Sequence, residues 1–588
     1  MKKQIFKLII FLIILAGFFV RLYRLNLNIP SLYADEVAGG YANYVYFQKP
    51  AVSLFDFLNK NFYFDSQKSP MYIGQNATKK QTSPTLRRST ASACCAVVYF
   101  KMVNFTWLFG LTPLGVRLPS AIYGTILLVF LYLFAKKINF KETKHKDFIP
   151  LVALITFSFA PWGIHLSRIG HPFVLLFLIM MSWHWILYLG AESPKEYLVS
   201  VIPLFFAAWC YPSGIVLGPL FVLLLIVKKR KDFLAQDIKI IFFLIIVTVG
   251  IFVFILPKVG ARGFDLAIWR DVNVTANENL DRGLARLSNP SIFSFNLNPD
   301  LAARLFYNYP LAVVRVFVRN YLSFFSPDFL FLKGDPVLRH SSGRFGELYL
   351  LFLPFLIYGI FLMATKGESK TKEMFLFWIL VAPIPAAITK DGAGYLLRVT
   401  TMLPLLTYLS ALGFVGSLEL FTRKTKIIYS FLVTLLFIFS VYNFLFHYFH
   451  VYPFYSAKSF EYGFKQLADF QRENNNQSML VIWDGYYPHF YFRFWQKTNY
   501  QEYLKNQMLT LTINESRFTK AFYNLYFSLP KKEEDLISFL NQNSVNYLIL
   551  PADLAEKFSH YKVFAEKPAA VIDYPDQTPA FYLYQVKK

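Results

Sequence analysis

The chain has 588 residues, of which 55% are hydrophobic and 16% are charged, and its formal net charge is +24. A soluble protein would carry about 25% charged residues, so this composition excludes an ordinary soluble globular protein. Much of the positive charge lies in short clusters between apolar runs, where it acts as a signal for membrane topology. The charge therefore gives no reason to expect nucleic acid as a partner.

Repeated apolar runs predict an α-helical polytopic membrane protein with about eleven transmembrane helices. Runs of roughly 17–23 residues are long enough to cross a hydrocarbon core of about 30 Å as helix. The predicted spans lie at about 5–22, 119–134, 148–165 and 172–189, on either side of 211–214, at 238–256 and 348–364, on either side of 389–395, and at 427–449.

The basic clusters predict which side each loop occupies. Lys2, Lys3 and Lys7 precede the first span and place the N-terminus in the cytoplasm as an uncleaved anchor. The same rule places two long segments, about 23–113 and 257–347, outside. We therefore expect an integral plasma membrane protein with a transmembrane catalytic domain over 1–450 and an extracytoplasmic domain over 451–588.

The last 138 or so residues have a different pattern. Phe460, Phe464, Leu467 and Phe470 recur at helical spacing, and short apolar runs follow at 479–483 and 545–550. Short apolar runs of strand length between helical patterns are typical of an α/β domain. A segment of this length can bury a core of its own.

With this topology, scattered ionisable residues share the outer side of the membrane. Such groups at the ends of membrane helices are functional candidates, and the alternative is that they snorkel to water. The candidates are Asp35, Glu36, Arg117, His165, Arg168, His171, Lys333, Asp335, Arg339, His340 and Arg398.

Carboxylates and arginines at the outer membrane edge suit a reaction on a lipid-linked phosphate. Arginine binds phosphate oxygens bidentately and stabilises charge on a phosphate leaving group. A carboxylate takes the proton from an attacking hydroxyl as general base. No nucleotide-binding motif appears on the cytoplasmic side, so a sugar used outside would arrive on a lipid carrier.

Three stretches carry a resemblance to a known group of enzymes. The acidic pair Asp35-Glu36 after the first span, the run 116–124 at the second span and the sequence 165–168 after the third resemble GT-C glycosyltransferases. The similar branch is the protein O-mannosyltransferase and aminoarabinose-transferase-like group, and the segment 321–340 is similar to its prokaryotic members. The resemblance covers about residues 1–450. It implies inverting transfer from a polyprenyl-phosphate sugar to a protein, lipid or glycan acceptor, on the extracytoplasmic face.

Carried over by position, Asp35 resembles the family's catalytic base, Glu36 its acidic partner, and Arg117 an arginine near the donor phosphate. Adjacent helical residues diverge by about 100°, so Asp35 and Glu36 are expected to have different tasks. The chain departs from the family at 169–172, where relatives carry an aspartate, and before Arg398, where they carry a histidine.

Other interpretations remain open at this point. A transporter or flippase of lipid-linked glycans is the main alternative, although the two halves show no repeat. A scaffold that presents the tail is a third. Asp328 and Asp335 suggest a divalent metal, but no ligand spacing requires one. The polar, basic segment 65–95 and the identity of the sugar are unexplained by the sequence.

Overall fold

The computed structural model describes residues 2–47, 104–138, 140, 145–236, 250, 267–287, 299–474, 477–483, 485, 488–499, 501–502, 509–521 and 524–586. The chain divides into two compact units, which are described separately below. The membrane unit comprises Met1–Arg21, Ile122–Ser167 and Pro172–Leu445, and the α/β unit comprises Leu22–Ala121, Arg168–His171 and Phe446–Lys588.

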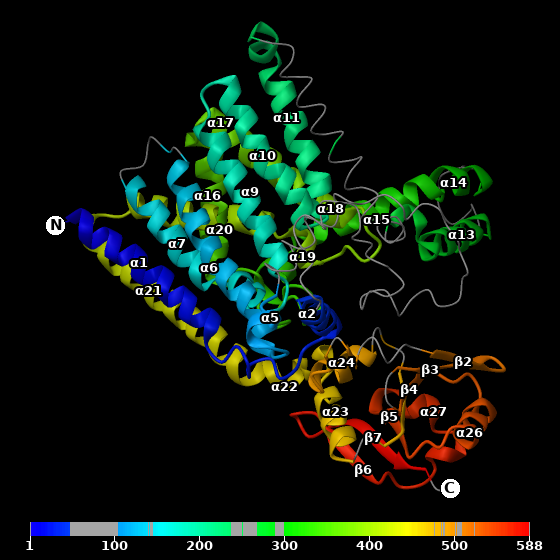
Figure 1. The fold of residues 1–588 in the computed structure, drawn as a ribbon. Coiled ribbons are helices and arrows are strands. Elements are labelled where there is room, and N and C mark those ends of the chain that lie inside the picture. Colours follow the sequence, from blue (N-terminus) through cyan, green and yellow to red (C-terminus); the bar gives the residue numbers. More distant parts are fainter. Residues whose placement is uncertain are drawn as a thin grey trace. The chain divides into compact units, whose positions relative to one another are not determined.

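The membrane unit is helical (Figure 1). Its elements are α1 (Lys2–Leu22), most of α6 (Pro113–Lys137), α7 (Ile149–Phe159), α8 (Pro161–Leu166), α9 (Pro172–Gly190), α10 (Pro194–Cys210), α11 (Ser213–Gln236), α13 (Val272–Leu287), α14 (Pro299–Phe306), α15 (Tyr309–Ser323), α16 (Leu353–Lys366), α17 (Ser369–Val381), α18 (Ile384–Ala387), α19 (Leu396–Val399), α20 (Met402–Ser417) and α21 (Arg423–Phe446).

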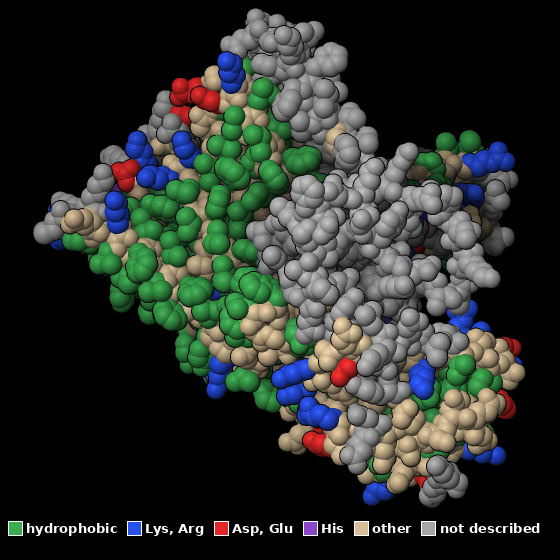
Figure 2. All heavy atoms as spheres, in the orientation of Figure 1, with side chains coloured by type: hydrophobic (Ala, Val, Ile, Leu, Met, Phe, Trp, Pro, Cys, Tyr) green, Lys and Arg blue, Asp and Glu red, His purple; other side chains and the backbone are tan. Residues whose placement is uncertain are grey.

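Five helical stretches of the described chain are long and apolar enough to cross a membrane. They are Gln4–Leu22, Pro113–Lys137, Pro172–Gly190, Met402–Leu420 and Arg423–Phe460, and two shorter apolar helices cover Ser213–Lys228 and Leu350–Lys366. Hydrophobic side chains cover the visible face of this helical bundle (Figure 2). The chain is therefore a helical membrane protein, while the count of eleven spans stays a prediction. The predicted span 238–256 lies outside the described residues apart from Gly250, and the basic segment 65–95 lies wholly outside them.

A buried arginine near the end of the first span ties it to the bundle. Arg21 Nη1 donates to the carbonyl oxygens of Gly17 (2.8 Å) and Ser158 (3.0 Å), and its Nε donates to Ser167 Oγ (3.1 Å). A buried guanidinium needs such acceptors, because leaving its charge without a partner would destabilise the fold by about 3–5 kcal/mol. Arg21 therefore fixes α1 against the end of α7 and the residue that follows α8.

The second span begins earlier than the sequence indicates. The expected start was Pro119, but α6 begins at Pro113 and contains Pro119 inside it. Proline lacks the N–H that would bond the carbonyl four residues before it. That carbonyl, of Gly115, instead accepts the N–H of Phe105 at 2.8 Å. The N–H of Phe105 thus replaces the helical hydrogen bond to Gly115 O that Pro119 cannot donate.

The α/β unit is built on a seven-stranded mixed sheet in the order β2-β3-β4-β1-β5-β7-β6. The strands are β1 (Met479–Ile482), β2 (Leu509–Ile513), β3 (Ser516–Lys520), β4 (Leu525–Ser528), β5 (Tyr547–Pro551), β6 (Ala570–Asp573) and β7 (Pro579–Gln585). β1 pairs in parallel with β4 and β5, and the outer pairs are antiparallel. The helices are α2 (Ala34–Phe47), α5 (Thr106–Phe109), α22 (Tyr452–Ser456), α23 (Phe464–Glu473), α24 (Pro488–Trp495), α26 (Glu533–Gln542) and α27 (Ala555–Phe558).

Both faces of the sheet are covered, which explains the continuous apolar run of β1. Met479 and Val481 face a core shared with α2, α23 and α24, whereas Leu480 and Ile482 face a core shared with α26 and α27. A strand that is buried on both faces has an unbroken apolar sequence.

The predicted α/β domain in the tail is confirmed. The helix α2, however, lies far from the tail in sequence and packs into the same core through Val37 and Tyr41. The boundaries 1–450 and 451–588 stay a prediction.

The α/β core contains a histidine that is neutral at neutral pH. His489 in α24 is buried, and desolvation, with a further contribution from Arg493, lowers its pKa to about 3. The unfolded chain protonates this histidine near pH 6.5, whereas the folded chain does not. Below pH 6.5 the unfolded state therefore binds the extra proton and folding stability falls.

We predict that acid weakens the fold through this residue by up to about 1.4 kcal/mol per pH unit below pH 6.5. The measurement is the apparent Tm of the purified protein in detergent between pH 7.5 and pH 5, for the wild type and for His489→Gln. The Tm of the wild type should fall more steeply. Parallel pH profiles for the two proteins would contradict the assignment.

Candidate active site

The two adjacent acids that follow α1 point in different directions. Asp35 and Glu36 both lie in the first turn of α2, where carboxylates interact favourably with the helix dipole. Asp35 is exposed, whereas Glu36 is buried. Glu36 Oε2 also accepts the backbone N–H of Tyr33 at 3.3 Å, as the third residue of a helix does in a capping box. The Asp35 carboxylate is thus accessible for chemistry, whereas the Glu36 carboxylate holds the start of α2 in place.

The buried acid forms a bidentate ion pair with Arg117 of α6. Arg117 Nε donates to Glu36 Oε1 and its Nη2 to Glu36 Oε2, both at 2.8 Å, and neither side chain is exposed. The same guanidinium donates from Nη1 to Ile29 O (3.1 Å) and from Nη2 to Ser31 O (2.6 Å). The ring of Phe460 lies 5.8 Å from the guanidinium carbon. Arg117 thus holds both the start of α2 and the chain that leads into it.

A glycine completes the coordination of Glu36. Gly170 N donates to Glu36 Oε1 at 2.7 Å. A Cβ at this position would lie 2.8 Å from Glu36 Cγ and 3.1 Å from Oε1, so a larger residue would displace the carboxylate. Relatives were expected to carry an aspartate within 169–172, and this chain uses that corner to bind Glu36 through its backbone.

Two further predicted residues lie in the same α/β unit. The hydroxyl of Tyr33 hydrogen-bonds to Nε2 of buried His171. The guanidinium of Arg168 lies over the rings of Tyr448 and Phe449, with 5.7 and 4.8 Å to the ring centroids. The structure therefore gathers Asp35, Glu36, Arg117, Arg168 and His171 around the start of α2. Sequence reasoning missed Tyr33 and Tyr448, since aromatic residues are too frequent in this chain for any pair to stand out.

The remaining predicted residues belong to the membrane unit and centre on a second buried acid. Asp335 Oδ2 accepts a hydrogen bond from His340 Nδ1 (2.8 Å) and another from the N–H of Leu396 at the start of α19 (2.7 Å). Asp335 Oδ1 accepts the N–H of Val337 at 2.7 Å. The carboxylate therefore fixes the orientation of the His340 ring and fastens the loop 333–347 to α19.

Glu347 is a buried acid that sequence reasoning missed. Its Oε1 accepts the backbone N–H of Asp335 at 3.1 Å. Burial raises the pKa of Glu347 well above its usual range, and the nearby Asp335 carboxylate raises it further, against a smaller opposing effect of that hydrogen bond.

The other cationic candidates of this unit have partners nearby. Lys333 is exposed and pairs with Asp328 at 3.2 Å. Arg398 binds Asp391 through both terminal nitrogens, at 2.6 and 3.2 Å. Nε2 of His165 lies 3.1 Å from the carbonyl oxygen of Arg339.

Within the described residues, no cluster of three or more histidine, cysteine, aspartate or glutamate side chains is arranged to hold a metal ion. Asp328 binds Lys333 and Asp335 binds His340, so the two acids proposed for a divalent site have different partners.

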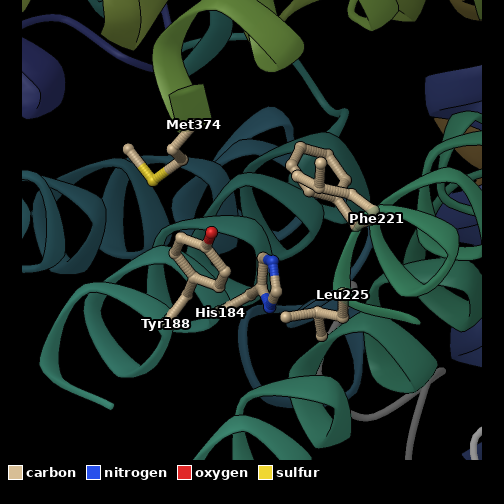
Figure 3. Close-up of a pocket in the computed structure, with 6 residues that line it drawn as sticks. His184, Tyr188, Phe221, Leu225 and Met374 are labelled. Atoms are coloured by element: carbon tan, nitrogen blue, oxygen red, sulfur yellow. The ribbon is translucent and has the colours of Figure 1, made fainter. Parts of the chain in front are cut away.

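The membrane unit also contains a small apolar pocket between its helices. It is lined by His184, Tyr188, Phe221, Leu224, Leu225 and Met374, and Figure 3 shows His184 and Tyr188 projecting into it from the same helix. His184 Nδ1 donates to Ser200 O at 2.7 Å, which joins α9 to α10. We assign this histidine to helix packing.

No family model and no curated protein matches the chain. Among solved structures, the chain is similar to the Archaeoglobus fulgidus oligosaccharyltransferase in its apo form, with 12% sequence identity and a TM-score of 0.42 over 97% of this chain and 74% of that one. The complex of that enzyme with Zn and sulfate gives 13% identity and a TM-score of 0.41, over 98% and 73% of the two chains. A likeness at this level says nothing about the residues of the site.

The Glu36–Arg117 pair generates a stability prediction. Removing one partner of a buried ion pair leaves the other charge uncompensated, at a cost of about 3–5 kcal/mol. Glu36→Gln and Arg117→Met should each lower the apparent Tm in detergent strongly. The double variant Glu36→Gln/Arg117→Met should lose less than the sum of the two single changes, because it leaves no unpaired charge. Additive losses would show that the two side chains do not stabilise each other.

Proposed function

We propose that the chain is an inverting glycosyltransferase that moves a sugar from a polyprenyl-phosphate donor to an acceptor hydroxyl at the extracytoplasmic membrane face. The observation that carries the proposal is the exposed Asp35 beside the buried Glu36–Arg117 pair. A carboxylate that is accessible to an acceptor hydroxyl and held at a fixed helix start can serve as a general base. The motifs around Asp35, Arg117 and Arg168 that resemble GT-C enzymes support the same reaction.

In this proposal Asp35 accepts the proton of the acceptor hydroxyl while that oxygen bonds to the anomeric carbon. The bond from this carbon to the phosphate oxygen breaks at the same time, and the polyprenyl phosphate leaves with the electron pair. A single displacement of this kind inverts the anomeric configuration. The transition state gathers negative charge on the leaving phosphate, which cationic side chains stabilise.

The contacts favour a different role for Arg117 from the phosphate contact expected from the sequence. Its Nε, Nη1 and Nη2 already donate to Glu36, Ile29 and Ser31. We therefore propose that Arg117 and Glu36 position α2, and that phosphate contacts come from other cations. In the α/β unit, which carries Asp35, the candidates are Arg168 and, as a polar contact, His171. The donor contacts expected from the sequence for residues of the membrane unit stay predictions for that unit; they are His165, Lys333, Arg339, His340 and Arg398, with Asp335 orienting His340.

Asp35→Asn should lower the rate of glycan transfer from a polyprenyl-phosphate sugar by about 10²–10⁴-fold, because the amide cannot accept the proton. The apparent Tm and membrane insertion should stay at the wild-type value, since Asp35 is exposed. The matched control is Glu534→Gln, an exposed carboxylate in the first turn of α26 in the same unit, which should transfer normally.

Near-normal turnover by Asp35→Asn would remove Asp35 from catalysis. Movement of a lipid-linked glycan across the membrane that depends on Asp35, with no transfer product, would instead favour the transporter.

Lys333→Glu tests the second group of residues. If the exposed ammonium contacts the donor phosphate, charge reversal should raise the KM for the donor about tenfold or more, whereas Lys333→Arg should retain most of the affinity. The measurement is the transfer rate against donor concentration. An unchanged donor KM for Lys333→Glu would remove Lys333 from donor binding and favour a structural role for the loop 333–340.

A further inference from the structure

Three helices of the membrane unit turn apolar side chains outward. In α13, α14 and α15 the exposed large hydrophobic residues are Leu280, Leu284, Leu301, Leu305, Phe306, Tyr309, Leu311, Val314, Val318 and Leu322. A surface helix of a soluble domain has the opposite arrangement, with charged residues outward. An exposed apolar surface of this extent marks an interaction site.

The pattern is clearest in α15, which buries Ala312 and Asn320 and exposes aliphatic residues beside two arginines. Leu311, Val314, Val318 and Leu322 follow the spacing i, i+3, i+7 and i+11, so they form one stripe along the helix. Val314 is 52% exposed and Leu322 is 57% exposed. On the opposite side, buried Asn320 donates to the carbonyl oxygen of Thr389 at 2.8 Å. The amide nitrogen of Asn320 thus ties the interior side of α15 to the bundle, whereas the aliphatic stripe is exposed.

The stripe continues into the apolar surface of the helical bundle. Tyr321, next to Leu322, donates its hydroxyl to the carbonyl oxygen of Leu380 in α17 at 2.9 Å. Leu376 and Leu380 are exposed on α17, and α17 packs against the apolar helix α20. The outward side of α15 therefore adjoins an apolar helix of the membrane bundle.

Aromatic and basic residues border the apolar stripe. Exposed Tyr309 donates its hydroxyl to the carbonyl oxygen of exposed Trp269, and Arg319 is exposed one residue after Val318. Figure 2 shows hydrophobic and basic side chains next to each other where Figure 1 places α14. Tryptophan, tyrosine and arginine beside an aliphatic surface are typical of the zone between lipid headgroups and acyl chains.

We propose that α13, α14 and α15 form an interfacial arm that lies in the lipid headgroup region, with its aliphatic stripe against acyl chains. The lipid surface is the partner because the stripe adjoins the apolar bundle and because its borders are aromatic and basic. The arm anchors the segment between the bundle and the loop 333–347 at a fixed depth. This proposal does not depend on the enzymatic one.

The test measures the environment of single positions on the arm. Cys94, Cys95 and Cys210 are replaced by serine, and a single cysteine is introduced by Val314→Cys, Val318→Cys, Arg319→Cys or Glu534→Cys. Each variant is labelled with an environment-sensitive fluorophore and placed in phosphatidylcholine nanodiscs, with or without lipid carrying a spin label near the headgroup. Exposed sites are chosen so that the fold is retained, and the apparent Tm verifies this.

Labels at Val314 and Val318 should emit at shorter wavelength and lose more than half of their fluorescence to the spin-labelled lipid. The label at Arg319 should be quenched less, and the label at Glu534, on the α/β unit, should be unaffected. Water-like emission at Val314 and Val318 would overturn the proposal. Short-wavelength emission without lipid quenching would also overturn it, and would indicate a protein partner or a second copy of the chain.

Discussion

The buried ion pair between Glu36 and Arg117 determines the geometry of the candidate site. The two residues are 81 positions apart, yet their side chains meet bidentately at 2.8 Å with no exposure to solvent. Burying two charges is costly, and only good geometry with further hydrogen bonds offsets that cost. Gly170, Tyr33, Ile29 and Ser31 supply those bonds. Because a displaced partner would leave a buried charge, α2 has one well-defined position.

The fixed position of α2 also fixes the backbone of the neighbouring acid, Asp35. Asp35 shares the first helical turn with Glu36 but is exposed, so an accessible carboxylate lies next to a buried and fixed one. The other side of α2 packs into the core of the α/β unit, where Tyr41 contacts Phe490 of α24 with ring centroids 5.9 Å apart. The C-terminal sheet therefore supports the helix that carries the proposed base. In the membrane unit, Asp335 orients His340 in the same way that Arg117 orients Glu36.

The sequence predicted those parts that depend on local pattern. Apolar runs located the long helices, the runs at 479–483 and 545–550 located β1 and β5, and the helical angle predicted that Asp35 and Glu36 diverge. Pairings between distant residues leave no such pattern, so the contact of Arg117 with Glu36 was not expected. The position of α2 in the C-terminal core was missed for the same reason. The outward apolar side of α15 was hidden because its spacing matches that of an ordinary buried face.

A structure of the protein with a bound polyprenyl-phosphate sugar tests the central claim most directly. The account predicts that Arg117 keeps both bonds to Glu36 and that the Asp35 carboxylate lies on the side of the sugar ring opposite the phosphate. It also predicts an open position for an acceptor hydroxyl at hydrogen-bond distance from Asp35, about 2.6–3.2 Å. An Arg117 that leaves Glu36 to bind the phosphate, or an Asp35 that is remote from the anomeric carbon, would contradict it.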